Sequence, residues 1–255
     1  MKIVKFKKTS KDKYKVYLDD NSCISLYEDV IINNNLLLTK EIEKSKIEDI
    51  IKQNNKYNLY MMALNYISIR VRSKKEVITY LEKKGAYLKD IDNTIERLTK
   101  EGYVNDFSYA KAYVNDQMLL SPSGPYKIKS NLIKNGVSSD IALEVIEDID
   151  NELLREKLYN LIGKQIRIKK GSKNEIKMKL LNYFINLGYD KNMILDELGK
   201  YEIKTDTNRL TKEYSKIFNK YSKKYKGNEL DYFIKGKLLS KGYSLYEIEK
   251  IKKDF

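Results

Sequence analysis

The 255-residue sequence contains no histidine, one cysteine and two prolines. Without histidine, Ser-His and Cys-His nucleophilic pairs and every histidine-containing metal site are excluded. The acidic residues are scattered at helical spacings beside lysines, which is typical of solvated helix faces. We therefore expect no catalytic residues, no metal site and no cofactor. An enzyme would have to work with carboxylates or lysines alone, and the sequence indicates no pocket for such chemistry.

The single cysteine, Cys23, excludes an internal disulfide framework and fits a reducing cytoplasm. We expect it to be a small packing residue. No window approaches the roughly 18 uninterrupted apolar residues of a membrane span. Residues 1–6 alternate charged and apolar side chains and lack the apolar region of a signal peptide. These features predict a cytoplasmic protein that does not enter a membrane.

The net charge of +14 favours an anionic partner, nucleic acid first. The chain has 44 lysines and six arginines with abundant Asn, Ile and Tyr, a composition that genome bias also produces, so the position of the charge is more informative than its total. The net charge by region is +2 over 1–55, +3 over 56–106, −3 over 107–152, +5 over 153–206 and +7 over 207–255. The positive charge is therefore concentrated in the C-terminal half.

The N-terminal segment, residues 1–55, has a strand pattern followed by a helix pattern. Tyr14, Val16 and Leu18 alternate with polar residues, turn residues follow at 19–22, and 23–27 resumes the strand pattern. We predict a hairpin with a third strand at 3–6, packed against a helix because a lone hairpin is marginal in water. Residues 41–52 carry isoleucines at helical spacing.

The rest of the chain repeats itself around four glycines: Gly85, Gly136, Gly188 and Gly242, separated by 51, 52 and 54 residues. An apolar residue lies four positions before each glycine (Leu81, Leu132, Phe184, Leu238), another six positions after (Ile91, Ala142, Ile194, Ile248) and another thirteen after (Leu98, Ile149, Tyr201, Phe255). Glycine just after a helix supplies the left-handed C′ conformation. Each unit therefore has a helix ending at glycine, a turn and a second helix, with a further helix upstream.

We predict a mainly α fold in which tandem three-helix repeats form an elongated, curved array, with a small β segment at the N-terminus. The repeats are assigned to 56–106, 107–152, 153–206 and 207–255. Two of the middle helices begin with capping boxes, Ser73 to Glu76 and Ser172 to Glu175. Most of the tyrosines fall on apolar stripes, so we expect them to pack in the core or to make half-buried amphipathic contacts rather than to form a base-stacking platform.

An ordered set of residues over 63–114 carries a family resemblance. The set comprises Ala63-Leu64, Tyr66-Ile67, Arg70, Arg72-Ser73, Glu76-Val77, Leu81, Lys84-Gly85, Leu98, Gly102-Tyr103-Val104-Asn105-Asp106, Tyr109-Ala110 and Tyr113-Val114. This set resembles the RecX family of bacterial regulators of the recombinase RecA. The resemblance is strong over 60–115 and extends to 150, and the added N-terminal segment and fourth repeat are similar to longer members of the family.

The resemblance implies a monomeric, non-enzymatic protein that binds the RecA–single-stranded DNA filament, with weak direct binding to DNA. Such a regulator restrains ATP hydrolysis and strand exchange, and so acts on recombination, DNA repair and the SOS response. The sequence departs from the family in its second repeat, which is net acidic and has Gln117 and 121–125 (Ser-Pro-Ser-Gly-Pro) where basic residues are usual. We therefore expect this repeat to contact protein rather than phosphate.

A first set of candidate binding residues belongs to the first repeat's middle helix: Arg70, Arg72, Lys74 and Lys75 around its start, and Lys84 at its end. Arg70 and Arg72 are either solvated charges near a helix end or contacts with acidic surface or phosphate, for which arginine is suited. Asp106 matches the family's most recognisable acid, and we expect it to cap the helix that starts at Phe107, with a partner contact as the alternative.

Two further basic stretches lie in the C-terminal half. The first contains Lys164, Arg167, Lys169, Lys170, Lys173 and Lys177. The second is a stripe that includes Lys212, Lys216 and Lys220, opposite an apolar face with Leu210 and Tyr214. Each is either an ordinary wet lysine face or a phosphate-tracking surface, whose affinity would fall about 10³-fold between roughly 50 and 200 mM salt.

Three other functions remain open from the sequence. A stand-alone nucleic-acid-binding protein would bind bare single-stranded DNA tightly whether or not RecA is present. A helical scaffold would bind a different protein, and an enzyme would need carboxylate-only chemistry.

Overall fold

The computed structural model describes residues 1–253, and these divide into two compact units. The first unit holds Met1–Ala112 and Leu132–Ala142, and the second holds Tyr113–Asn131 and the chain from Leu143 onward. Phe255, the last position of the apolar pattern, lies outside the described residues.

The N-terminal segment contains the predicted three-stranded antiparallel sheet, with β1 (Ile3–Ser10), β2 (Lys13–Leu18) and β3 (Cys23–Tyr27) in that order. Val16 and Leu26 are buried on one face of the sheet. Cys23, which we expected to be a packing residue, is exposed. It is paired with Tyr17 and lies on the face opposite to Val16, since successive side chains of a strand alternate.

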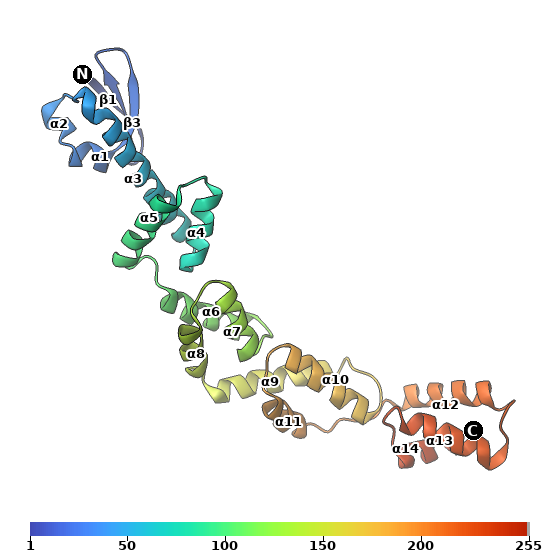
Figure 1. Cartoon of the computed structure of the whole chain (residues 1–255). Coiled ribbons are helices and arrows are strands. Elements are labelled where there is room, and N and C mark those ends of the chain that lie inside the picture. Colours follow the sequence, from blue (N-terminus) through green and yellow to red (C-terminus); the bar gives the residue numbers. More distant parts are fainter. Residues whose placement is uncertain (254–255) are drawn as a thin grey trace. The chain divides into compact units, whose positions relative to one another are not determined.

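Two short helices, α1 (Glu28–Asn33) and α2 (Leu36–Thr39), follow the sheet and were not predicted. After a 3₁₀ turn, η1 (Lys44–Lys46), α3 runs from Ile47 to Ile67. Of the helix expected over 41–52, only residues 47–52 belong to α3, and Glu41 instead forms an isolated bridge with Lys2. The boundary assigned at 55/56 falls inside α3. No glycine or proline interrupts this stretch. α3 packs on the sheet, where the Asn54 side chain accepts from the Tyr27 N–H (2.9 Å) and donates to the Ser25 carbonyl (3.1 Å) (Figure 1).

The remaining chain forms helices in groups of three, as the glycine pattern predicts (Figure 1). Repeat 1 contains α3, α4 (Lys74–Lys83) and α5 (Leu88–Lys100); repeat 2 contains α6 (Asp106–Leu120), α7 (Pro125–Lys134) and α8 (Ser139–Glu147); repeat 3 contains α9 (Asn151–Ile166), α10 (Lys173–Asn186) and α11 (Lys191–Gly199); repeat 4 contains α12 (Thr207–Tyr221), α13 (Gly227–Leu239) and α14 (Leu245–Lys252). The mainly α fold of three-helix repeats with an N-terminal sheet is thus confirmed.

The repeated positions have the roles that their spacing predicts. All four glycines have positive φ, between 79° and 91°, just after α4, α7, α10 and α13. The apolar residues four before and six after each glycine are at most 1% exposed. Of the residues thirteen after, Leu98 is fully buried, whereas Ile149 and Tyr201 are half-buried.

Each middle helix begins against the glycine turn of the next repeat. The Ser73 hydroxyl, before α4, donates to the Asn135 carbonyl (2.7 Å), and the Ser172 hydroxyl, before α10, donates to the Lys241 carbonyl (2.8 Å). Before α7, the Gly124 N–H donates to the Leu187 carbonyl (2.7 Å). In all three cases the acceptor is the residue just before the repeat glycine. We call these contacts the repeat joints; each of them lies inside one compact unit.

Three of the repeat glycines are therefore needed because the start of the preceding repeat's middle helix approaches them closely, as well as because they have positive φ. A Cβ on Gly136 would lie 2.4 Å from the Lys75 Cβ, and one on Gly188 would lie 2.4 Å from the Lys127 backbone nitrogen. A Cβ on Gly242 would lie 2.8 Å from the Ser172 hydroxyl. For Gly85, by contrast, the described residues other than Gly85 and its two chain neighbours place no atom within 4 Å of the position that a Cβ would take.

This difference predicts unequal costs for alanine at equivalent positions. We expect Gly85→Ala to lower the free energy of unfolding by about 1–2 kcal/mol, the cost of a left-handed residue with a Cβ. Gly188→Ala should cost a further 1–3 kcal/mol or so, because the backbone of α7 must move away. Urea unfolding followed by circular dichroism measures both; equal losses in the two variants would contradict the repeat joint.

Candidate partner-binding surface

The start of α4 carries the complete capping box that the sequence predicts. The Ser73 hydroxyl accepts from the Glu76 N–H (3.2 Å), and the Glu76 carboxylate accepts from the Ser73 N–H (3.1 Å). Ser73 is fully buried because its hydroxyl also makes the repeat joint. These contacts fix where the neighbouring basic side chains, from Arg70 to Lys75, lie.

Arg70 and Arg72 have different roles. Arg70 pairs with Glu76 (2.6 Å) while its side chain is 51% exposed. The Arg72 guanidinium lies 4.1 Å from the centroid of the Tyr66 ring, and only 12% of its side chain is exposed. Its ion pair with Glu76 is long, at 3.9 Å. Arg72 is therefore mainly a packing residue, whereas Arg70 is paired with Glu76 and still keeps about half of its side chain exposed.

Asp106 does not cap the helix that follows it, so this prediction is wrong by one residue. The Asn105 side chain accepts from the N–H groups of Phe107 (2.9 Å) and Ser108 (3.0 Å). The Asp106 carboxylate instead accepts from the Lys74 N–H (2.8 Å), at the first residue of α4. A carboxylate is favourable at this helix N-terminus, so Asp106 ties α6 to α4.

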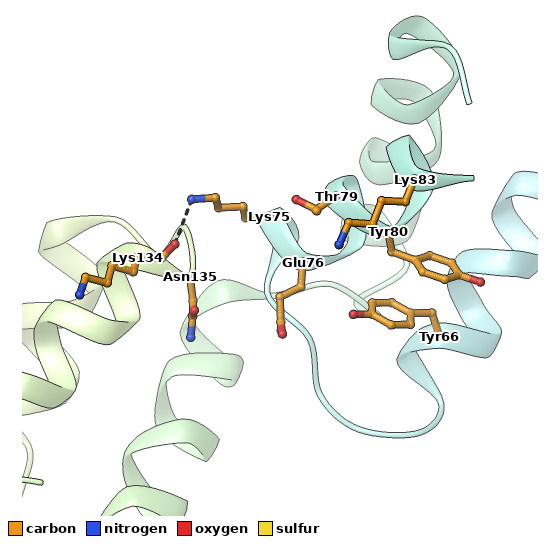
Figure 2. Close-up of a pocket in the computed structure, with 8 residues that line it drawn as sticks. All are labelled: Tyr66, Lys75, Glu76, Thr79, Tyr80, Lys83, Lys134 and Asn135. Atoms are coloured by element: carbon orange, nitrogen blue, oxygen red, sulfur yellow. Dashed lines mark hydrogen bonds between the residues drawn. The ribbon is translucent and has the colours of Figure 1, made fainter. Parts of the chain in front are cut away.

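A pocket of about 270 Å³ lies beside α4 and is drawn in Figure 2. We call it the α4 pocket; its lining residues are Tyr66, Lys75, Glu76, Thr79, Tyr80, Lys83, Lys134 and Asn135. The Tyr66 and Tyr80 rings stack with centroids 4.1 Å apart on one side, and Lys75 donates to the Lys134 carbonyl (2.9 Å) on the other. These two tyrosines are half-buried: they pack against the core of repeat 1 and also line the pocket.

The α4 pocket has an excess of positive charge. Its one carboxylate, Glu76, is engaged by Arg70 and by the Ser73 N–H. Lys83 and Lys134 are exposed, and among residues 1–253 no carboxylate forms an ion pair with either of them. Lys84, also in the candidate set, lies with its ammonium 5.7 Å from the Tyr80 ring centroid. Lys83 and Lys134 are absent from the predicted set because their proximity depends on the first repeat joint.

The corresponding pocket of repeats 3 and 4 is internally neutralised. It is lined by Glu175, Arg209, Glu213 and Lys241 among others. Arg209 pairs with Glu213 (3.0 Å) and Glu175 (3.4 Å), and Lys241 pairs with Glu213 (2.6 Å). Of the two pockets, the α4 pocket is therefore the better anion site.

The second predicted capping box forms only in part. The Ser172 hydroxyl accepts from the Glu175 N–H (3.1 Å), but the Glu175 carboxylate pairs with Lys179 and Arg209. A complete box that we did not predict, Ser244 with Glu247, starts α14. Its Ser-x-x-Glu pattern is visible in the sequence.

The basic run around α10 is spread over several elements. Lys164 lies on α9, Arg167, Lys169 and Lys170 lie in the connection, and Lys173 and Lys177 lie on α10. The Lys169 ammonium is 5.4 Å from the Tyr183 ring centroid, and the Lys173 N–H donates to the Thr205 hydroxyl (3.0 Å). The run is therefore assembled from two helices and the connection between them.

The stripe on α12 is more uniform. Lys212, Lys216 and Lys220 are exposed, and within the described chain none of them pairs with a carboxylate. Leu210 and Tyr214 are buried on the other side of the same helix. Because the three lysines lie at four-residue spacing, their ammonium groups project from one helix face.

Across residues 1–253, His, Cys, Asp and Glu side chains form no group of three that could hold a metal ion. Among the described helices, none combines the length and apolar character of a membrane span.

The fold is that of a helical-repeat protein with lysines on its surface that no internal carboxylate neutralises. A family model for the first three-helix domain of RecX matches residues 60–98. The chain is 31% identical to the regulatory protein RecX of Streptococcus gordonii, with 100% of both chains covered. It is 30% identical to that of Bacillus cytotoxicus, covering 96% of this chain and 94% of the relative. The chain belongs to the RecX family of regulatory proteins.

Two solved structures are similar. A crystal structure titled as regulatory protein RecX has a TM-score of 0.66 at 20% identity, covering 76% of this chain and 98% of its own, and shows the fold. The crystal structure of RecX from Lactobacillus salivarius has a TM-score of 0.55 at 28% identity and covers 58% of this chain and 97% of its own.

The two arginines give a paired prediction. Arg72→Ala should lower the free energy of unfolding by about 1–2 kcal/mol, because it removes a stacked, largely buried guanidinium. Arg70→Ala should change it by less than about 1 kcal/mol, since an exposed ion pair contributes little. Urea titrations of both variants measure the difference. If Arg70→Ala were the more destabilising change, the assignment of Arg72 as a packing residue would be wrong.

Proposed function

We propose that this protein binds the RecA–single-stranded DNA filament and modulates ATP hydrolysis and strand exchange, without catalysing a reaction itself. The observation that carries the proposal is the full-length match to relatives named regulatory protein RecX. The family's regulation of RecA connects the chain to recombination, DNA repair and the SOS response, and a cytoplasmic monomer fits this role.

The proposed contacts use the lysines that have no internal counter-charge. Lys83 and Lys134 of the α4 pocket, with Lys75 and Arg70 beside them, would meet acidic protein surface or phosphate. The α12 stripe would track phosphates, since exposed lysines at regular spacing suit a backbone rather than a base edge. The second repeat, which lacks the usual basic residues, would contact protein.

The proposed mechanism is restraint by binding. The repeat joints hold neighbouring helices through buried hydrogen bonds, so each joined pair would resist bending. A protein with this construction, bound to more than one RecA protomer, would oppose the motions that accompany ATP turnover. It would also occupy positions that a second DNA strand needs.

The first test is RecA's DNA-dependent ATPase. Lys83→Glu with Lys134→Glu should require about tenfold more protein for half-maximal effect, since roughly 1.4 kcal/mol of binding is lost. The matched control is Lys89→Glu with Lys100→Glu, two exposed lysines on α5 of the same repeat. An ATPase that is unchanged by a stoichiometric excess of the natural protein would overturn the proposal.

The same experiments separate the rival functions. Tight binding to bare single-stranded DNA at physiological salt, unaffected by RecA, would favour a stand-alone nucleic-acid binder. Recovery of a different bacterial protein without RecA would favour a scaffold.

Salt dependence tests the α12 stripe. Replacing Lys212, Lys216 and Lys220 by Gln should make the slope of log affinity against log salt shallower by about 2, at ~0.7 for each contact with a single-strand phosphate. The control replaces Lys191, Lys237 and Lys250 by Gln. These are three exposed lysines of the same compact unit, and their replacement should leave the slope unchanged. Filament binding measured by fluorescence anisotropy between 50 and 200 mM salt supplies both slopes; equal changes would remove the stripe from the interface.

A further inference from the structure

The N-terminal sheet has one apolar face and one basic face. Phe6, Val16 and Ile24 are cross-strand neighbours that belong to the segment's hydrophobic core. Because side chains alternate along a strand, the residues between them point the other way. That outer face carries Lys5 and Lys7 of β1, Lys15 and Tyr17 of β2, and Cys23 and Ser25 of β3.

The strand register places like charges side by side. Lys7 is paired directly with Lys15, and Lys5 is paired with Tyr17. Like charges opposite each other on a sheet are destabilising. All three lysines are exposed, and no carboxylate among residues 1–253 forms an ion pair with any of them. The arrangement therefore lacks a counter-charge within the described chain.

Protection of a free strand edge explains only part of this charge. Lysines commonly protect edge strands from pairing with other chains, and β1 is an edge strand. Lys15, however, lies on β2, which is hydrogen-bonded on both sides, by β1 and β3. Its position opposite Lys7 has no role in edge protection.

The overall charge of the segment does not reveal this positive face, because acidic residues elsewhere in the segment offset the lysines. Asp19 and Asp20 are in the β2–β3 turn, where the Asp20 side chain accepts from the Ser22 N–H and hydroxyl. Asp29 on α1 accepts from the Tyr57 hydroxyl. The segment's net charge of +2 is therefore the sum of a basic sheet face and of acidic residues in turns and helices.

We propose that the outer face of the N-terminal sheet binds single-stranded nucleic acid. Lys5, Lys7 and Lys15 would contact successive phosphates, which supplies the missing counter-charge. Tyr17 lies among these lysines, half-buried, and its ring would support an unpaired base. A basic surface with an aromatic ring is the combination by which proteins hold single strands without reading sequence. This inference stands apart from the proposed regulation of RecA, since it concerns binding to bare nucleic acid.

The test is binding of the full chain to a labelled oligothymidine at about 50 mM salt. Replacing Lys5, Lys7 and Lys15 together by Gln should weaken binding roughly tenfold and make the salt slope shallower by about 2. The control replaces Lys44, Lys46 and Lys52 by Gln, which changes the net charge of the same segment by the same amount. Lys46 and Lys52 already pair with Glu43 and Asp49, so the control should weaken binding less than about threefold. Tyr17→Ser should also weaken binding.

Stability gives a second readout for these variants. Because the Lys7–Lys15 pair is repulsive, removing it should leave the melting temperature unchanged or raise it at low salt, which shows that the variant is folded. Equal loss of DNA binding in the two triple variants would overturn the proposal, and so would tighter binding to duplex than to single strands. Unchanged DNA binding with weaker binding to RecA in the absence of DNA would also overturn it, since the face would then recognise acidic protein. RecA's ATPase, measured in parallel, reports on the regulatory proposal independently.

Discussion

The repeat architecture depends on one contact that occurs three times: a middle helix begins against the glycine turn at which the next repeat's middle helix ends. The acceptors are carbonyls next to the C-terminus of a helix, which lack partners within that helix. The donors lie at a helix N-terminus, so the partial charges of the two helix ends are complementary. Each joint thus gives a partner to a carbonyl that has none within its own helix, and it requires a residue without a side chain at the turn.

Two chemical solutions produce the same joint. Before α4 and α10, a buried serine hydroxyl both accepts from the first turn of its own helix and donates to the neighbouring carbonyl. Before α7 the backbone of Gly124 donates instead, and a Cβ there would lie 2.6 Å from the Gly188 carbonyl carbon. Lys157 supports this second form by donating to the carbonyls of Gln117 (2.9 Å) and Ser123 (3.3 Å), and burial lowers the pKa of its ammonium. The segment at 121–125 therefore has a structural reason to lack basic residues.

Sequence spacing was sufficient to predict the features that depend on local geometry. The glycine period predicted the helix ends and the buried positions around them, because a left-handed C′ residue and a helical apolar stripe each leave a pattern in one chain segment. Features that depend on contacts between segments were not predictable. Asn105 and Asp106 are both good capping residues, and only the position of α4 decides which of them caps α6. Similarly, Lys83 and Lys134 are distant in sequence and line one pocket because of the first joint.

The arginines show why residue type alone is a poor guide to binding in this chain. Five of the six are engaged internally, by carboxylates or by tyrosine rings: Arg70, Arg72, Arg97, Arg155 and Arg209. A guanidinium is suited to such sites because it is planar and can stack and form ion pairs at the same time. Lysine has the opposite property, since its ammonium is strongly hydrated and stays at the surface unless a carboxylate or, as at Lys157, backbone carbonyls hold it.

The exposure of a lysine therefore does not by itself indicate a binding site, because every amphipathic helix or strand has its polar side chains on the outside. The informative observation is whether a carboxylate of the protein neutralises the lysine. In the pocket of repeats 3 and 4, two carboxylates neutralise Arg209 and Lys241. In the α4 pocket, on α12 and on the outer face of the sheet, the lysines have no carboxylate partner in the described chain, and on the sheet two of them are paired with each other. Uncompensated charge raises the energy of the free protein, and an anionic partner would remove that energy on binding. We therefore expect such a partner to bind most strongly at these positions, which the total charge of +14 does not identify.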